Sequence, residues 1–144
     1  MAIRINSSQA TSHKLPEVLY SLLTPTLALA GAAYVFAPGY SLAGVFGYVK
    51  DAPSLFFWQN IGIALMTMAP TLTYTLKKEA AAGRLYETSL SRTLNFGLLG
   101  VSAGHLAVLV PMLAAAQGGS LLPWLVGAWS VGAAAGGVGL LRRR

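Results

Sequence analysis

The chain has 144 residues, of which 55% are hydrophobic and only 10% charged, whereas soluble domains carry about 25% charged side chains. Ten Lys and Arg against four Asp and Glu give a net charge of +6, and these charges fall in short clusters between long uncharged runs. This pattern excludes a soluble enzyme, a disordered chain and a nucleic-acid-binding module, and it predicts an all-α integral membrane protein.

Residues 1–17 form the first predicted segment, a polar N-terminal tail. It contains basic residues and several Ser and Thr, and no acidic residue precedes Glu17. Organellar targeting segments have such a composition, but this stretch is short, and a solvated tail is the favoured interpretation. Because the segment lacks the apolar core of a secretory signal peptide, we expect the first apolar run to be retained.

Three uncharged runs follow, and they are long enough for four membrane crossings. About 20 helical residues span a hydrocarbon core of about 30 Å. We predict a single four-helix transmembrane domain over residues 18–141, and its spans are 18–37, 55–76, 93–116 and 121–141. The turn sequence Gln117-Gly118-Gly119-Ser120 separates the last two spans. No span alternates polar and apolar residues, as the strands of a membrane β-barrel do.

Four crossings place both termini and the loop 77–92 on one side of the membrane. That side then carries every Lys and Arg except Lys50, including the basic anchor 142–144. Since Lys and Arg are enriched in cytoplasmic loops, this side is predicted to face the cytoplasm, stroma or matrix. The aromatic residues gather near the opposite side. The connection 38–54 is apolar, and we expect it to lie along the membrane surface or beneath a neighbouring protein.

His105 is the principal candidate for a binding residue. It lies near the middle of the third span, where a neutral imidazole can ligate the Mg of a chlorophyll or another metal. Asn95 and Gln59, near helix ends, are secondary candidates for the same cofactor. The alternative for His105, a hydrogen bond to a backbone carbonyl or to a hydroxyl, is favoured over the ligand role. A haem held by two histidines is excluded within one chain because His13 lies in the tail.

Small residues predict where helices pack closely. Gly100 and Gly104 form one such pair, and Ala128, Gly132 and Gly136 recur every four residues in the last span. The sequence from Gly100 to Gly104 also matches the G-x-S-x-G motif of hydrolases. That motif requires a strand-to-helix turn and a partner acid, so we favour the packing interpretation. The neighbour of the last span is expected to be the third span, another protein, or a flat ligand such as a pigment or a quinone.

The absence of acidic residues within the spans excludes several functions. Proton-coupled carriers, retinal pumps and prenyl-transfer enzymes depend on such carboxylates, and without Cys there is no thiolate chemistry. We therefore expect no enzymatic activity and no metal centre built from clustered ligands.

In size, one-sided basic charge and Gly and Ala content, the chain is similar to small accessory subunits of photosynthetic and respiratory membrane complexes. This resemblance implies a structural subunit that contacts other integral membrane subunits and lipid. A photosystem or antenna in the thylakoid membrane of a plastid is favoured, with chlorophyll ligated by His105, or carotenoid, as the pigment. The alternatives are a respiratory complex in another organellar or bacterial inner membrane, and a small oligomeric transporter or channel.

Overall fold

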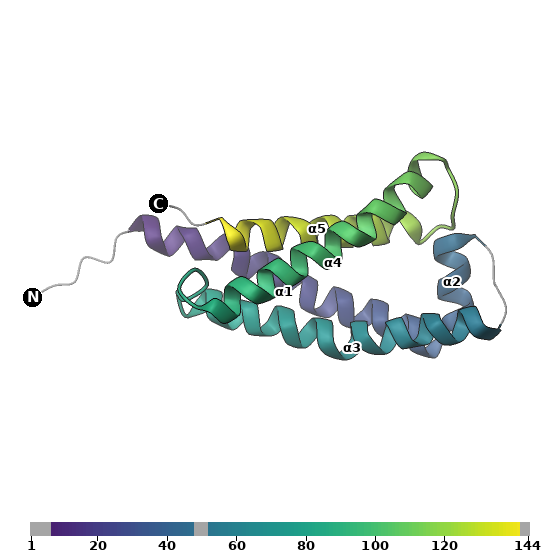
Figure 1. Cartoon of the computed structure of the whole chain (residues 1–144), viewed down its shortest axis with the longest axis horizontal. Helices are drawn as coiled ribbons and strands as arrows, with labels where there is room; N and C mark the ends of the chain where they lie inside the picture. Colours follow the sequence, from purple (N-terminus) through teal and green to yellow (C-terminus); the bar gives the residue numbers. More distant parts are fainter. Residues whose placement is uncertain (1–6, 48–51, 142–144) are drawn as a thin grey trace, which may run out of the picture.

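The computed structural model describes residues 7–47 and 52–141, with side chains from Lys14 onward, and within these ranges it contains helices and turns but no strand. The helices are α1 (Ser7–Phe36), α2 (Pro38–Phe46), α3 (Ala52–Ala81), α4 (Ser89–Ala114) and α5 (Leu122–Leu140). The four long helices run along a common axis, and the short α2 closes one end (Figure 1). For the described residues, the prediction of an all-α fold is confirmed.

The long helices contain most of each predicted span and extend beyond some of them. Helix α1 begins at Ser7, so that residues 7–17, predicted as part of a polar tail, continue the helix. Helix α3 runs past the second span to Ala81 because Lys, Glu and Ala are good helix formers, and it is followed by Gly83 with a φ of 72°. The first six residues of the predicted tail, Lys50 and the basic anchor 142–144 lie outside the described residues.

Three helical stretches are long and apolar enough to cross a membrane. They are Lys14–Phe36, Ala52–Ala81 and Ser89–Ala114. Helix α5 has 19 residues and is not one of these three stretches. These apolar helices are compatible with a membrane protein.

The long helices form two antiparallel pairs, α1 with α3 and α4 with α5. Glycines allow the closest approach in each pair. A Cβ added to Gly31 in α1 would lie 2.7 Å from the carbonyl oxygen of Gly62 in α3, and one added to Gly136 in α5 would lie 2.8 Å from the backbone nitrogen of Leu99 in α4. Contact between backbones is therefore what fixes the packing within both pairs.

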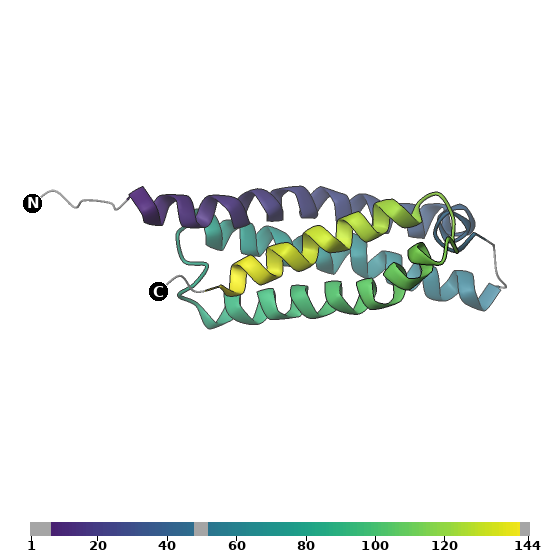
Figure 2. The same cartoon turned by 90° about the horizontal axis from the view of Figure 1, so that it is seen from above.

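The start of α1, the turn between α3 and α4, and the end of α5 meet at one end of the bundle (Figure 2). There the Tyr20 hydroxyl donates a hydrogen bond to Asn95 Oδ1 at 2.5 Å, and Asn95 Nδ2 donates to the Ser91 carbonyl at 2.9 Å. Tyr20 belongs to α1 and Asn95 to α4, so this buried chain of hydrogen bonds joins the two pairs.

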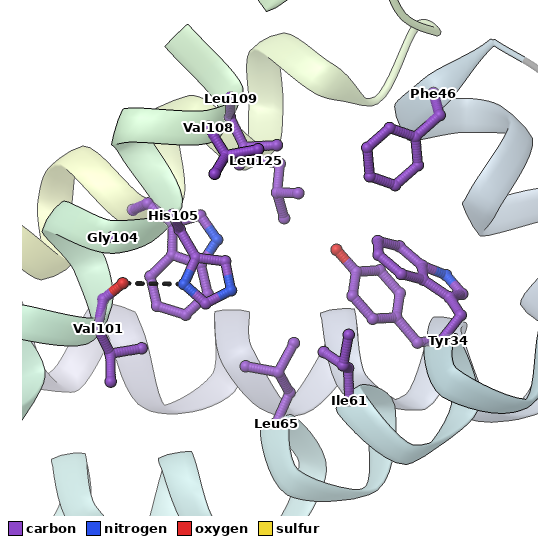
Figure 3. A pocket seen from close by; sticks show the side chains of 12 residues that line it. Tyr34, Phe46, Ile61, Leu65, Val101, Gly104, His105, Val108, Leu109 and Leu125 are labelled. Atoms are coloured by element: carbon purple, nitrogen blue, oxygen red, sulfur yellow. Dashed lines mark hydrogen bonds between the residues drawn. The ribbon is translucent and has the colours of Figure 1, made fainter. Parts of the chain in front are cut away.

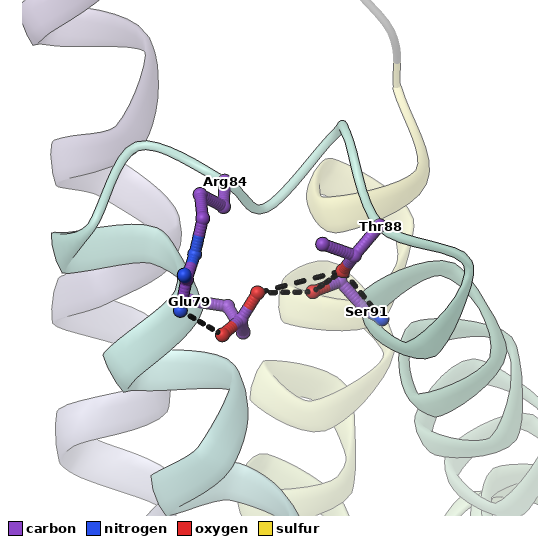
Figure 4. A network of polar contacts seen from close by, with 4 residues as sticks. All are labelled: Glu79, Arg84, Thr88 and Ser91. Carbon is purple, nitrogen blue, oxygen red and sulfur yellow. Dashed lines mark hydrogen bonds and ion pairs between the residues drawn. The ribbon is translucent and has the colours of Figure 1, made fainter.

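Polar contacts also fix the turn between α3 and α4 at this end (Figure 4). Arg84 forms an ion pair with Glu79 Oε1 at 2.8 Å, and the hydroxyls of Thr88 and Ser91 lie 3.4 and 3.5 Å from Glu79 Oε2. The Thr88 hydroxyl also accepts a hydrogen bond from the Ser91 amide, which caps the N-terminus of α4. The end of α3 is thus tied to the start of α4.

At the opposite end, α2 joins the two pairs. The amides of Gly119 and Leu121 donate to the carbonyls of Val45 and Gly44 at 3.0 and 2.7 Å, so the turn between α4 and α5 is bonded to α2. The bundle is therefore closed at both ends. Between these ends α3 contacts α4 only sparsely. The candidate site lies where these two helices are not packed together.

Candidate functional site

A cavity of about 470 Å³ lies between the two helix pairs, toward the end that α2 closes. Small-molecule sites have volumes of about 300–1,000 Å³ and mostly apolar walls. All five helices contribute to this cavity, whose lining residues are Tyr34, Phe46, Trp58, Ile61, Leu65, Val101, Gly104, His105, Val108, Leu109, Leu125 and Trp129.

The cavity opens sideways, between α3 and α4. Three of its apolar lining residues, Ile61 on α3 and Val101 and Val108 on α4, are exposed on the surface of the bundle. Since α3 and α4 pack only sparsely against each other, the opening follows from the weak packing between them. Any molecule that enters here passes between apolar side chains.

His105 forms one wall of the cavity, and its ring is held from two directions. The imidazole stacks on the indole of Trp129, with ring centroids 4.0 Å apart and planes inclined by 17°. Its Nδ1 lies 2.8 Å from the Val101 carbonyl oxygen. A carbonyl only accepts, so Nδ1 carries the proton, and in the neutral ring Nε2 has a free lone pair. Nε2 faces the cavity (Figure 3), and no described residue donates a hydrogen bond to it.

Tyr34 projects from α1 into the cavity from the side opposite His105 (Figure 3). Its ring stacks on Trp58, with centroids 4.0 Å apart, and Trp58 is itself fixed because its Nε1 donates to the Ser41 hydroxyl at 2.8 Å. Tyr34 is 4% exposed, and among the described residues its hydroxyl has no hydrogen-bond partner. The hydroxyl is thus a buried polar group that points at the space inside the cavity.

Two further buried polar atoms lack partners among the described residues: Nε1 of Trp129 and Oγ of Ser102. Trp129 is 3% exposed and lines the cavity, whereas Ser102 is packed against Gly132 and does not line it. A buried group left unpaired costs about 1–3 kcal/mol, and most such groups in proteins are paired. Tyr34 and Trp129 therefore place two unpaired hydrogen-bond donors at one cavity.

Among the residues expected to bind a cofactor, only His105 lines the cavity. Asn95 is fully buried elsewhere, and its amide is used by Tyr20 and Ser91. Gln59 lies outside the cavity and donates to the Val35 carbonyl of α1 at 3.2 Å. Both amides contribute hydrogen bonds between helices.

The small residues expected at helix contacts fall into two groups, those on α5 and those on α4. Gly132 and Gly136 of α5 lie against α4, and Ala128, on the same helix, is half-buried. No described residue outside the local helix backbone lies within 4 Å of a Cβ built on Gly100 or Gly104, so this pair does not pack against another helix of the chain.

The sequence alone does not single out the helix contact at Gly31 and Gly62 or the position of Tyr34 at the cavity. Gly31 and Gly62 are single glycines within long apolar runs, and this is the signal that marks them as possible contact points. Tyr34 was counted only among the aromatic residues near one membrane face, and no local signal distinguishes its hydroxyl from those of its neighbours.

Comparison with known proteins adds no assignment, since the sequence matches no protein-family model, no curated protein and no solved structure.

Proposed function

We propose that this protein is an integral-membrane accessory subunit that holds a hydrophobic small molecule in the cavity beside His105. The observation that carries the proposal is the cavity itself, which combines apolar walls with the inward-facing Nε2 of His105 and hydroxyl of Tyr34. Apolar walls with a few convergent polar groups are typical of ligand sites. The sideways opening suits a ligand that arrives from the lipid.

The proposal includes four membrane crossings, with α5 as the fourth. At 1.5 Å per residue the 19 residues of α5 extend about 28 Å, close to the hydrocarbon thickness of about 30 Å. Helix α5 packs along α4, which is long and apolar enough to cross. Support for the orientation comes from Lys14, Lys77, Lys78, Arg84 and Arg92, which belong to the end of the bundle where α1 starts and α5 ends.

Exposed aromatic side chains support the position of the other membrane face. Phe36, Tyr40 and Trp124 are each about 80% exposed and lie at the end of the bundle that α2 closes. Aromatic rings are enriched at membrane interfaces, where one part of the ring system is apolar and the other is hydrated. We propose that this end lies at the interface opposite the basic one.

We propose that the protein is a subunit that binds a ligand and does not catalyse a reaction. The proposal rests on its surface and on its side-chain chemistry. No group of three metal-ligating side chains occurs among the described residues, and many large apolar side chains point outward. Lipid and other membrane subunits are the proposed neighbours of these side chains. The proposed setting is a photosynthetic complex, and a respiratory complex is the alternative.

The test is purification of the tagged protein from its own membrane in mild detergent. We expect it to elute with larger partners and to carry an apolar molecule, detected by absorption and by mass spectrometry of a solvent extract. His105→Phe keeps a ring against Trp129 but removes Nε2, and it should lower the bound amount about tenfold. Gln59→Ala, outside the cavity, is the matched control. A monomer that carries no apolar molecule would contradict the proposal.

A further inference from the structure

We infer that the ligand of this cavity is a hydroquinone, the two-hydroxyl reduced form of a membrane quinone, and that the cavity prefers it to the oxidised form. This inference rests on the proposed function and names the class of molecule that the cavity holds. It concerns binding alone: the hydroquinone keeps its protons and electrons.

The first step is the hydrogen-bonding character of the His105 wall. Because Nδ1 donates to the Val101 carbonyl at 2.8 Å, the proton of the neutral ring stays on Nδ1 and Nε2 acts as an acceptor. The stack on Trp129 fixes the plane of the ring. The ligand atom that meets Nε2 must therefore bring a proton or a metal ion.

The second step concerns the opposite wall, where Tyr34 offers a hydrogen-bond donor that has no partner among the described residues. The buried Tyr34 hydroxyl points into the cavity. A second donor without a partner there, the Trp129 N–H, belongs to a lining residue on the His105 side, because the indole stacks on the imidazole. A ligand that pairs these donors must offer oxygen acceptors. A ligand that fits this cavity therefore donates a hydrogen bond to Nε2 of His105 and accepts one from the Tyr34 hydroxyl.

Three ligand chemistries can be compared against this pattern. A quinone carries two carbonyl oxygens, which can accept from Tyr34 and from Trp129, but neither can donate a hydrogen bond to Nε2. A metal tetrapyrrole satisfies Nε2 through its metal ion but supplies no acceptor for Tyr34 from that ion. A hydroquinone has a hydroxyl at each end of one ring, so one hydroxyl donates to Nε2 while the other accepts from Tyr34. Of the three, only the hydroquinone donates to Nε2 through a hydroxyl and accepts from Tyr34 through a second hydroxyl on the same ring.

The shape of the cavity agrees with a single ring that carries an apolar tail. Two stacked ring pairs, Tyr34 with Trp58 and His105 with Trp129, provide flat walls, and about 470 Å³ is sufficient for one substituted six-membered ring. The tail of a membrane quinone would leave through the apolar opening between α3 and α4. A tail in that opening remains in contact with lipid.

The test is equilibrium dialysis of the full chain in phospholipid nanodiscs against duroquinol, a tetramethylhydroquinone, and duroquinone, its oxidised form, with protein-free nanodiscs as background. We expect the wild-type protein to bind duroquinol at least tenfold more tightly than duroquinone. Tyr34→Phe keeps the stack on Trp58 and should weaken duroquinol binding about tenfold. His105→Phe should remove the preference for the reduced form. Tyr74→Phe, on the exposed face of α3, is the matched control and should bind as the wild type does.

Three outcomes would overturn the inference. They are equal affinity of the wild type for the two redox forms, unchanged duroquinol affinity in both cavity variants, and no binding of either ring. A parallel titration with a zinc chlorin separates this failure from that of the proposed function. If the chlorin binds with a spectral shift that His105→Phe abolishes, the hydroquinone is the wrong ligand but the cavity remains a ligand site. If neither probe binds, both proposals fail.

Discussion

Polar side chains within the apolar helices are paired in two different ways. Thr26, Thr67 and Thr71 each donate to the carbonyl four residues earlier, so their hydroxyls are satisfied within one helix. Asn95 and Tyr20 satisfy each other across two helices, 75 residues apart in sequence. The second kind fixes how helices sit against each other, because the partner of each group lies on another element.

We expect Asn95→Leu to destabilise the fold by about 1–2 kcal/mol, since it leaves the buried Tyr20 hydroxyl without its partner. Tyr20→Phe should have a similar effect. The double variant should lose less than the sum of the two, because the pair is removed together. The measurement is the free energy of unfolding of each of the three variants in mixtures of mild detergent and SDS. Asn60→Leu, where the amide bonds only within α3, is the control, and equal losses at positions 60 and 95 would contradict the prediction.

Close backbone contact at glycines contributes to the packing of both helix pairs, beside the buried side chains of the core. The α1–α3 crossing places Gly31 against Gly62, and a Cβ added to Gly62 would lie 2.6 Å from Cβ of Tyr34. Helices gain little from hydrophobic association inside lipid, so van der Waals contact along the backbones must hold them together. The same crossing sets the position of Tyr34, three residues beyond Gly31, and with it one wall of the cavity.

Gly31→Ala should therefore cost about 1–3 kcal/mol of stability, because the new methyl group forces α1 and α3 apart. Gly100→Ala adds the same group to a helix of similar length, where nothing beyond the local helix backbone lies within 4 Å among the described residues. That variant should lose no stability and should gain up to about 1 kcal/mol, because Ala is a better helix former than Gly. The free energies of unfolding of the two variants are compared by SDS titration. Similar losses in both would contradict a close approach of α1 and α3 at Gly31 and Gly62.

Over the molecule as a whole, two helix pairs are joined at both ends and by packing of α1 against α5, whereas α3 and α4 are only sparsely in contact. The Tyr20–Asn95 and Glu79 contacts close one end, and α2 with the turn between α4 and α5 closes the other. This arrangement leaves a cavity between the pairs, on the side where α3 and α4 pack sparsely. The cavity is thus a consequence of where the pairs are joined.

The proposed threading predicts which positions react with a membrane-impermeant thiol reagent in sealed vesicles. The chain has no Cys, so single substitutions give an unambiguous signal. Glu87→Cys, before α4, and Leu141→Cys, after α5, should be labelled from the same face, and Gln117→Cys, between these helices, from the opposite face only. Labelling of Leu141→Cys together with Gln117→Cys would mean that α5 does not cross the membrane.

Sequence alone determined the helical class, the approximate bounds of the four long helices and the turn that divides the last two. These features depend on hydropathy and helix propensity over neighbouring residues, which a single chain displays directly. It also singled out His105, because an imidazole is rare in such a run. It ranked Asn95 and Gln59 below His105 as candidates for the same cofactor, but it could not show that their amides pair with groups on another helix.

Only the tertiary structure decided which polar groups are paired and which face a common space. Tyr34 and His105 lie on different helix pairs, and their meeting at one cavity depends on the Gly31–Gly62 crossing and on the sparse packing between α3 and α4. Such contacts join residues that are far apart in sequence, and no local pattern encodes their distance. The cavity is therefore a property of how the helices pack, whereas the helices themselves are a property of the residues along each one.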